Sequence, residues 1–348
     1  MGMLVEGLWQ EEEQIIQSGV FVRPASIFAQ EIPPEVIQGL IREPGRYHLI
    51  ASGSCQWSHR TVILRQLMKL KDHIPLYLAH GPRLQGYAID GGADWTVPGS
   101  HKLPASPDGI RIKHLHQLYS HSKPDYSGRV TVPLLWDSWQ QKIISNESAM
   151  IIRAFDATSA FPNPAGTEYS FFPAKLEPEM KVLDQRIYDR LGNGVYRAGF
   201  AQTQEAYDKA IDEVFSELDK LESHLGKNRF LFGEIITASD WKLFTTLVRF
   251  DAVYHHLHRC TKYRLIDYPS LWAYTRDLYS WPGIADTVDF SVIREASYKN
   301  DTSHNPSGIL PIAPVAGWLA PHNRGELSLA SIMNRSGESL SLFSLFPT

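Results

Sequence analysis

The 348-residue sequence lacks any run of about 20 apolar residues, so we expect no membrane-spanning helix. Its first stretch, MGMLVEGLWQEEEQIIQSG, carries acidic residues and has no apolar core of the kind found in a secretory signal. It also lacks a basic excess, because 34 Lys and Arg against 38 Asp and Glu give a formal net charge of -4. Binding to phosphate backbones requires such an excess. We therefore expect a soluble protein with no nucleic-acid or membrane partner.

Cysteine is equally scarce. The only two, Cys55 and Cys260, cannot form the disulfide framework of a small secreted fold, and this favours a reducing, cytoplasmic location. No GxGxxG or Walker pattern stands at a strand-to-helix turn. The usual sequence evidence for a nucleotide site is therefore missing.

The length exceeds that of a single hydrophobic core and predicts two domains. The first part of the chain alternates short apolar runs with turn residues, as expected of an α/β unit. In order, these segments predict a strand at 47–52, a helix over 61–70 that starts near Gln56, a strand at 74–80, a loop over 91–108, a strand at 130–137 and a helix at 146–155 capped by Ser145 or Asn146.

From about residue 200 the apolar residues recur with the period of an amphipathic helix. One helix runs through TQEAYDKAIDEVFSELDKLESHL and stops at Gly226. A second opens at Thr237, with Asp240 returning the contact of a capping box, and continues to 250. This pattern predicts an all-α domain. The tail from about 300, rich in Ser, Pro, Asn and Gly, predicts either extended coil wrapped on the body or partial disorder.

The stretch SGSCQWSHR places Cys55 where a strand ends and a helix begins. The free N–H groups and the dipole of a helix N-terminus favour a thiolate there. His59 and Arg60 add donors or positive charge nearby, although Arg60, one turn on, fits a solvent-facing position equally well. The alternative is that Cys55 merely fills a gap in the core. For Cys260 we expect a mid-helix position.

A second stretch, VTVPLLWD followed by SNES, suggests a ligand site. Pro133 cannot donate to a ladder, so it predicts an edge or a tight bend, with a cis bond as one option, which leaves the N–H and C=O of Val132 free for a peptide-like ligand. Glu147 and Ser148 open the following helix. They either complement its dipole or clamp an amino acid, with Ser148 and the helix N–H groups on the carboxylate and Glu147 on the ammonium.

The histidine-rich pieces KHLHQLYSH and YHHLHRC raise the question of a metal site. If helical, His256 and Cys260 are four residues apart on one face. No second cluster closes such a site, so we expect surface or core histidines and no metal.

Several blocks of the sequence together resemble the glutathionyl-hydroquinone reductases, the Xi class of the glutathione transferases. The resemblance spans roughly residues 20–325. It rests on CQWSHR, RVTVPLLWD, SNESAMIIRAF, VYRAGFAQTQEAYDKA, FLFGEIITASDWKLFTTLVRFDAVY and NPSGILPIAP.

This resemblance implies a glutathione transferase fold, with an α/β thioredoxin-like N-terminal domain followed by an all-α C-terminal domain. We expect an N-terminal extension at 1–44, the glutathione-binding domain at 45–160, the helical substrate domain at 161–325 and a tail at 326–348. It also implies a role for each candidate site residue. Cys55 is the nucleophile, Tyr196, Tyr254 and Tyr298 face the aromatic substrate, Trp95 lies over the glycyl end of glutathione, and Val132, Pro133, Glu147 and Ser148 bind glutathione.

The implied reaction is the glutathione-dependent reduction of glutathionyl-hydroquinones through a mixed disulfide, with glutathione as co-substrate, aromatic quinone or hydroquinone conjugates as partners, and neither metal nor nucleotide. We also expect a homodimer. Two alternatives are a general thiol transferase or dehydroascorbate reductase and a non-catalytic binding module. One departure stands out, because the family pattern has proline and alanine where this chain has Gln56 and Ser58. Gln56 adds a backbone donor and a polar side chain beside the sulfur.

Overall fold

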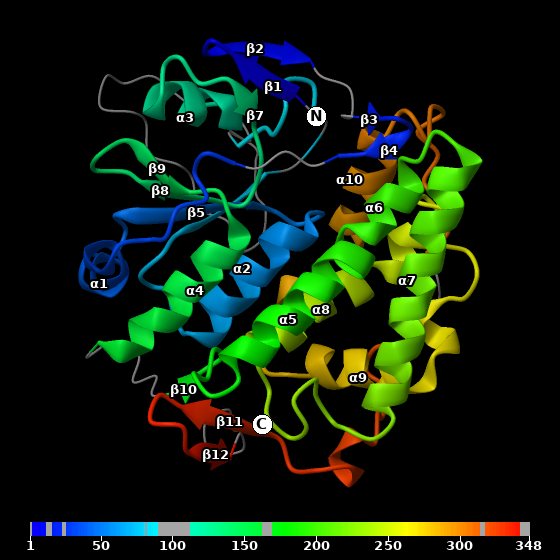
Figure 1. Cartoon of the computed structure of the whole chain (residues 1–348). Helices are drawn as coiled ribbons and strands as arrows, with labels where there is room; N and C mark the ends of the chain where they lie inside the picture. Colours follow the sequence, from blue (N-terminus) through cyan, green and yellow to red (C-terminus); the bar gives the residue numbers. More distant parts are fainter. Residues whose placement is uncertain are drawn as a thin grey trace. The chain divides into compact units, whose positions relative to one another are not determined.

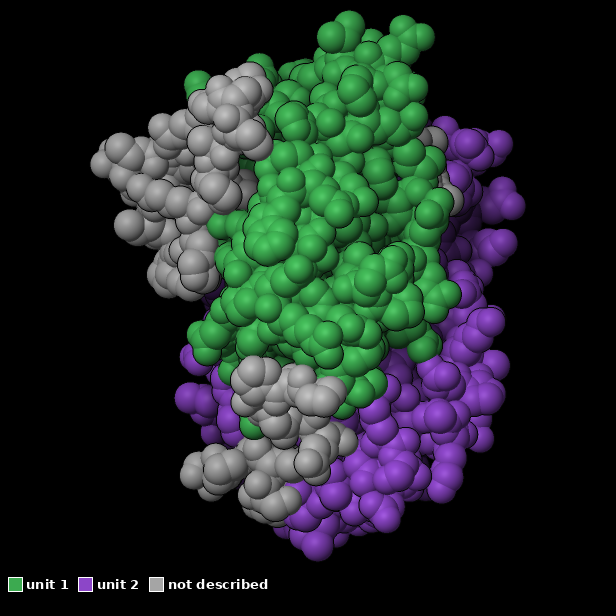
Figure 2. Space-filling view, turned by 90° about the vertical axis from the view of Figure 1, so that its left-hand side faces the viewer, with its two compact units in different colours: residues 1–14, 23–167 green, residues 15–22, 168–348 purple. Residues whose placement is uncertain are grey.

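In the computed structural model of the chain, residues 2–11, 16–22, 26–79, 81, 83–89, 112–161, 169–313 and 317–341 are described. The chain divides into two compact units, shown in different colours in Figure 2. Unit 1 comprises residues 1–14 and 23–167, and unit 2 comprises 15–22 and 168–348. A short N-terminal hairpin thus belongs to the unit formed mainly by the C-terminal half of the chain.

The core of unit 1 is a four-stranded sheet in the order β6-β5-β8-β9. β5 and β6 are parallel, whereas β8 is antiparallel to both of its neighbours, β5 and β9. All six residues of β5 are buried, as expected of a central strand. The elements of this unit are β1 (Gly2–Val5), β2 (Leu8–Glu11), α1 (Pro34–Arg42), β5 (Tyr47–Ser52), α2 (Gln56–Leu67), β6 (Leu76–Ala79), α3 (Leu115–Ser122), β7 (Gly128–Arg129), β8 (Leu134–Asp137), β9 (Lys142–Ser145), α4 (Ser148–Ala157) and the 3₁₀ turn η1 (Thr158–Ala160).

Helices cover both faces of this sheet. In Figure 1, α2 and α4 lie side by side on one face and α3 lies on the other, with the hairpin β1–β2 and strand β7 beyond it. Arg46 fastens the start of β5 to the end of β8, because its guanidinium contacts both carboxylate oxygens of Asp137 at 2.6–3.1 Å. This arrangement confirms the predicted thioredoxin-like α/β unit.

The predicted segments of this unit are found with shifted ends. The strand at 47–52 is confirmed, and α2 begins at Gln56, but it ends at Leu67 because Lys69 takes a left-handed conformation with φ +56°. The strand predicted at 130–137 pairs only over Leu134–Asp137. The residues before it make the bend at the cis peptide bond between Val132 and Pro133.

Unit 2 is mainly helical, which confirms the predicted all-α domain. Its elements are β3 (Ile16–Gln17), β4 (Val20–Phe21), β10 (Tyr169–Ser170), α5 (Glu177–Ile187), the π-helix η2 (Tyr188–Gly192), α6 (Gly194–Gly199), α7 (Gln204–Leu225), α8 (Ala238–Leu247), the π-helix η3 (Phe250–Tyr254), η4 (Leu265–Asp267), α9 (Pro269–Tyr279), η5 (Ala285–Thr287), α10 (Phe290–Asn300), η6 (Arg324–Glu326), β11 (Ser331–Asn334) and β12 (Ser339–Ser341).

Two predicted helix signals of this unit are confirmed, the stop of α7 at Gly226 and the capping box at the start of α8. Thr203 caps α7 by accepting from the N–H of Ala206, and α7 ends at Leu225, before Gly226. The capping box of α8 is complete between Thr237 and Asp240. However, α8 ends at Leu247 rather than 250, and the chain continues through the π-helix η3, which carries Tyr254.

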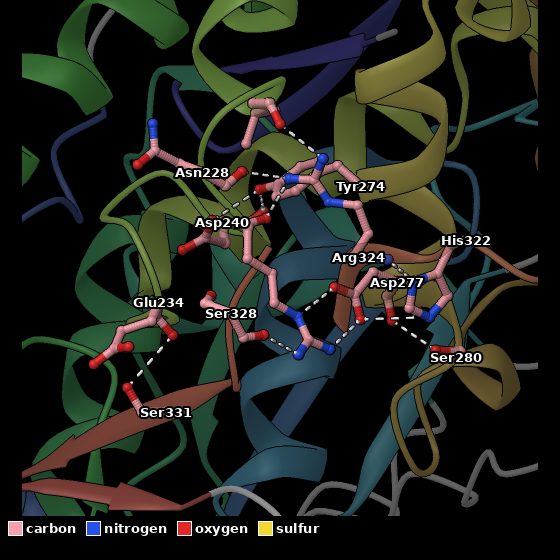
Figure 3. A network of polar contacts seen from close by, with 12 residues as sticks. Asn228, Glu234, Asp240, Tyr274, Asp277, Ser280, His322, Arg324, Ser328 and Ser331 are labelled. Atoms are coloured by element: carbon pink, nitrogen blue, oxygen red, sulfur yellow. Dashed lines mark hydrogen bonds and ion pairs between the residues drawn. The ribbon is translucent and has the colours of Figure 1, made fainter. Parts of the chain in front are cut away.

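The described part of the tail is fastened to unit 2 by a polar network (Figure 3). Arg324 donates to the carbonyl of Leu225, the last residue of α7, at 2.7 Å and to the carbonyls of Asn228 and Arg229 in the chain that follows the helix. Arg229 in turn makes a two-point contact with Asp277 of α9 and donates to the carbonyl of Ser328. Residues 331–341 form the hairpin β11–β12, so this part of the tail is not plain coil.

Candidate active site

Cys55 lies between β5 and α2 and is the N-cap residue of α2. Its N–H donates to the carbonyl of Ser52 at 3.1 Å, and its Sγ accepts from the N–H of Ser58 at 3.4 Å. The thiol is free and half-buried. The predicted helix-start position is therefore confirmed, with the sulfur at the N-terminal end of a 12-residue helix.

Cys260 has the opposite environment. It is fully buried, and burial raises the pKa of its thiol. The expected mid-helix position is wrong, because Arg259 takes a left-handed conformation with φ +59° and the chain at Cys260 is no longer helical. The helix that would have placed His256 and Cys260 on one face is therefore not present at Cys260. No group of three or more His, Cys, Asp or Glu that could hold a metal ion exists among the described residues.

The bend before β8 lies next to the sulfur. Cys55 Sγ is 3.8 Å from the carbonyl oxygen of Val132, and Val132 and Pro133 are both buried. The N–H of Val132 has no hydrogen-bond partner in the described part of the chain. This is the arrangement expected where an extended, peptide-like ligand pairs with the backbone.

The topology brings a second helix start to the same edge of the sheet. β9 is antiparallel to β8, as β5 is, so β5 and β9 run in the same direction. α2 follows the end of β5, and α4 follows the end of β9. Both helices therefore begin at one edge, and the start of antiparallel β8, after Pro133, lies there too. Cys55, the Val132–Pro133 bend and the Glu147–Ser148 pair are thus gathered on one edge.

The N-cap of α4 differs from the prediction. Glu147 is the cap, because its Oε1 accepts from the N–H of Ala149 at 3.0 Å and from the Ser148 hydroxyl at 3.3 Å. Ser145 and Asn146 precede the cap: the Ser145 oxygen accepts from the N–H of Glu147 at 3.1 Å, and Asn146 Oδ1 accepts from the Ser26 hydroxyl. The Ser145 hydroxyl donates to the carbonyl of Phe28, and the Asn146 amide donates to the Tyr119 hydroxyl.

Three further residues named in the sequence analysis are Arg60, His59 and Trp95. Arg60 does not face solvent, because it is 7% exposed and its guanidinium lies 4.5 Å from the centroid of the Trp57 ring. His59 is buried as well. Trp95, predicted to cover the glycyl end of glutathione, lies outside the described residues.

Within unit 2, the structure brings two of the three predicted tyrosines together. The hydroxyls of Tyr196 on α6 and Tyr254 at the end of η3 are 3.5 Å apart, and their rings meet edge to face at 5.8 Å. Tyr298 on α10 is buried and pairs instead with Nδ1 of His256 at 3.3 Å. Burial raises the pKa of Tyr298.

Sequence reasoning missed the groups around these tyrosines. His258 is buried and packs against the rings of Tyr196 and Tyr254 at 5.1 and 5.2 Å. His304 packs edge to face against Phe200 at 4.9 Å. The histidine-rich sequence drew attention to this region, but its spacing did not indicate which histidine faces a tyrosine.

Comparisons with known proteins identify the family. Models of the glutathione S-transferase N-terminal and C-terminal domains match residues 54–158 and 204–277. The glutathionyl-hydroquinone reductase YqjG of Escherichia coli is 41% identical over 93% of this chain and 98% of its own length. PcpF of Sphingobium chlorophenolicum, also named a glutathionyl-hydroquinone reductase, is 38% identical over 90% of this chain and 96% of its own. The chain belongs to the glutathionyl-hydroquinone reductase family.

Solved structures agree with this assignment to the Xi class of glutathione transferases. The glutathione-bound structure of YqjG has a TM-score of 0.74 at 42% identity, covering 81% of this chain and 89% of its own. The Xi-class enzyme of Natrialba magadii has a TM-score of 0.80 at 34% identity, covering 94% and 98%.

Gln56 and Ser58, the two expected departures from the glutathionyl-hydroquinone reductase pattern, lie in the first turn of α2. Gln56 is 1% exposed and the Ser58 side chain is fully buried. Both polar side chains therefore lie inside unit 1, and neither is a solvated surface residue.

Among the described helices, none is long and apolar enough to span a membrane.

Proposed function

We propose that this protein reduces glutathionyl-hydroquinones to free hydroquinones, with glutathione as the reductant. The activity is the one that the names of YqjG and PcpF state. The observation that carries the proposal is Cys55, a free thiol at the N-cap of α2, beside the Val132 carbonyl and on the sheet edge where α4 begins.

In the first step, the Cys55 thiolate attacks the sulfur of the glutathionyl group. The new S–S bond forms as the bond from that sulfur to the ring carbon breaks. The electron pair of the broken bond goes to the ring carbon, which takes up one proton and leaves as the hydroquinone. The cysteine is left as a mixed disulfide with glutathione.

In the second step, the thiolate of another glutathione attacks the glutathionyl sulfur of this mixed disulfide. The bond to Cys55 breaks with its electron pair on the Cys55 sulfur, and oxidised glutathione leaves. The sum converts one glutathionyl-hydroquinone and one glutathione into one hydroquinone and one glutathione disulfide. No metal or nucleotide takes part in either step.

The other residues have assigned roles in this scheme. The N–H and C=O of Val132, before Pro133, pair with the glutathione backbone, while Glu147 takes the ammonium and Ser148 with the first N–H groups of α4 takes the carboxylate. Trp95 covers the glycyl end. Tyr196, Tyr254 and Tyr298 give hydrogen bonds and a proton to the leaving aromatic fragment.

The decisive experiment is turnover of a glutathionyl-hydroquinone by the purified protein with excess glutathione. We expect hydroquinone and glutathione disulfide in equal amounts. Reduction of a small glutathione mixed disulfide without any cleavage of the thioether would instead assign a general thiol transferase. Glutathione binding with no turnover of either substrate would assign a binding module.

Compartment and assembly are also proposals. Both cysteines are free thiols, and Cys55 must remain one to attack the substrate, so a reducing cytoplasm suits the chemistry. We keep the expected homodimer and the division into a glutathione-binding domain at 45–160 and a substrate domain at 161–325. The molar mass in solution tests the first, and glutathione-site and aromatic-site variants test the second.

A further inference from the structure

The carbonyl of Gly199, the last residue of α6, accepts two hydrogen bonds from distant parts of unit 2. His304 Nε2 lies 2.7 Å from this oxygen, and Arg259 donates to it through Nη2 at 2.5 Å. Gly199 is less than one helical turn after Tyr196, Arg259 is five residues after Tyr254, and His304 is six residues after Tyr298. The three tyrosine-bearing segments are therefore tied together at one oxygen.

His304 is the better-fixed donor of the two. Its Nδ1 lies 2.9 and 3.0 Å from the two carboxylate oxygens of Asp301, and the side chains of His304 and Asp301 are only 16% and 14% exposed. Arg259, by contrast, is an exposed residue. Both ring nitrogens of His304 thus face an acceptor, an arrangement that only the doubly protonated imidazolium satisfies fully.

The position of α6 matters because its last residue, Gly199, packs closely against the ring of His258. A β-carbon on Gly199 would come within 2.7 Å of His258 Cγ. His258 in turn packs against Tyr196 and Tyr254 at 5.1 and 5.2 Å. A shift of the end of α6 therefore changes the contact between the two tyrosines, whose hydroxyls are 3.5 Å apart.

The local charges favour the ion pair of His304 with Asp301. The hydrogen bond with Asp301 is the main reason why the pKa of His304 is raised, against the effect of burial. Burial alone would raise the pKa of Asp301, but hydrogen bonds from His304 and Ser303 lower it overall. The other titratable groups facing His304 are His258, whose pKa burial lowers, and the cation of Arg259.

We propose that His304, oriented by Asp301, is a positioning residue that holds the end of α6 through the Gly199 carbonyl and so fixes Tyr196 against Tyr254 for action on the aromatic half of the substrate. The inference rests on the proposed function, because it needs the tyrosines to act on the leaving ring. It adds a pH dependence to that function. When His304 loses a proton, one of its two ring contacts loses its donor, and α6 is held less firmly.

The first test compares His304→Ala with the control Arg264→Ala, which removes an exposed ion pair with Asp267 on the same unit. We expect His304→Ala to lower kcat on a glutathionyl-hydroquinone by about tenfold, as small displacements of catalytic groups do, with a smaller change in KM. Reduction of a glutathione mixed disulfide should fall far less. Arg264→Ala should match the parent on both substrates.

His304→Gln provides the conservative replacement, because its amide can still donate to the Gly199 carbonyl. We expect it to recover most of the activity lost in His304→Ala. Equal losses on both substrates in His304→Ala, or no recovery in His304→Gln, would overturn the positioning role. Circular dichroism and thermal unfolding of each variant identify any that fail to fold.

The second test is the pH dependence of the ratio between thioether and mixed-disulfide turnover, since both reactions share the Cys55 thiolate. A histidine with a raised pKa stays protonated below its ordinary value of about 6.5 and loses the proton only above it. The ratio should therefore be level up to about pH 6.5 and fall at higher pH in the parent, and stay level in His304→Gln. A parent ratio that is level throughout, or a fall that persists in His304→Gln, would contradict the inference.

Failure of this inference is distinguishable from failure of the proposed function. If Tyr196→Phe selectively loses hydroquinone release but His304→Ala does not, only the role of His304 is wrong. If Tyr196→Phe shows no selective loss, the tyrosines do not act on the ring, and the role proposed for them in releasing the hydroquinone is wrong.

Discussion

Two helix starts, one in each unit, are capped in different ways. At the start of α8, Asp240 is fully buried and accepts four hydrogen bonds of 2.9–3.0 Å, from the N–H groups of Leu231 and Thr237 and the hydroxyls of Thr237 and Tyr274. At the start of α2, Cys55 offers only a sulfur, 3.4 Å from the Ser58 N–H, and remains half-buried. The first start is suited to stability, and the second leaves its capping atom, the Cys55 sulfur, as a free and half-buried thiol.

The largest expected effect is on activity at the start of α2. Cys55→Ser should abolish hydroquinone release, by more than about 10³-fold, because a serine hydroxyl is a far weaker nucleophile. Serine is a good N-cap, so the free energy of unfolding should hardly change. Steady-state kinetics and thermal unfolding measure the two effects. The matched control is Cys260→Ser, and its loss of activity without unfolding would contradict the assignment.

The next effect concerns the hydroxyl pair of unit 2. Removing one donor that stabilises a transition state commonly costs about 10²–10³-fold in rate. Tyr196→Phe and Tyr254→Phe should each lower hydroquinone release by about this factor, while mixed-disulfide reduction stays within a few-fold, since a thiolate leaves without a phenol. Equal losses on both substrates would indicate a defect in folding or glutathione binding.

At the start of α8, the loss should appear in stability and not in chemistry. Asp240→Ala removes an acceptor shared by four donors and leaves several of them buried and unpaired, at about 1–3 kcal/mol each. We expect the free energy of unfolding to fall by about 3 kcal/mol or more in urea denaturation. The folded fraction should keep its activity per active site. An Asp240→Ala protein of parental stability would show that the capping box is not the stabilising feature.

The smallest effect is expected at the start of α4, where one side chain, Glu147, both caps the helix and is proposed to bind glutathione. Glu147 caps the helix through Oε1 and is half-buried, so truncation should cost about 2 kcal/mol of glutathione binding, roughly 30-fold. Glu147→Gln keeps a capping oxygen but removes the charge, and it should lose affinity without losing stability. Calorimetric titration with glutathione checks this, and parental affinity in Glu147→Ala would show that the clamp is misplaced.

Features that depend on residues close together in the sequence were predicted correctly. The strand before Cys55, the N-terminus of α2, the stripe of α7 and the capping box of Thr237 and Asp240 are all encoded within a few positions of each other. The family resemblance added the roles of Cys55 and the tyrosines, and the family itself is confirmed by the relatives.

Features set by distant contacts could not be predicted. Ser145 lies two residues before the cap Glu147, and the hydroxyl that accepts from the Glu147 N–H also donates to the carbonyl of Phe28, 117 residues away. The Gly199 carbonyl meets a donor 105 residues later, and no local pattern around His304 indicates that partner. The hairpin β3–β4 belongs to unit 2 because its partners are there: Gln202 donates to the carbonyl of Gly19.

The most direct test of the central claim is a single turnover without added glutathione, followed by intact-mass measurement. With one equivalent of glutathionyl-hydroquinone, the account predicts release of one hydroquinone per protein and a gain of one glutathionyl group. The group should be located on Cys55, retained in Cys260→Ser and absent in Cys55→Ser. Release of hydroquinone with no protein adduct, or an adduct that persists in Cys55→Ser, would contradict the claim that Cys55 is the attacking thiolate.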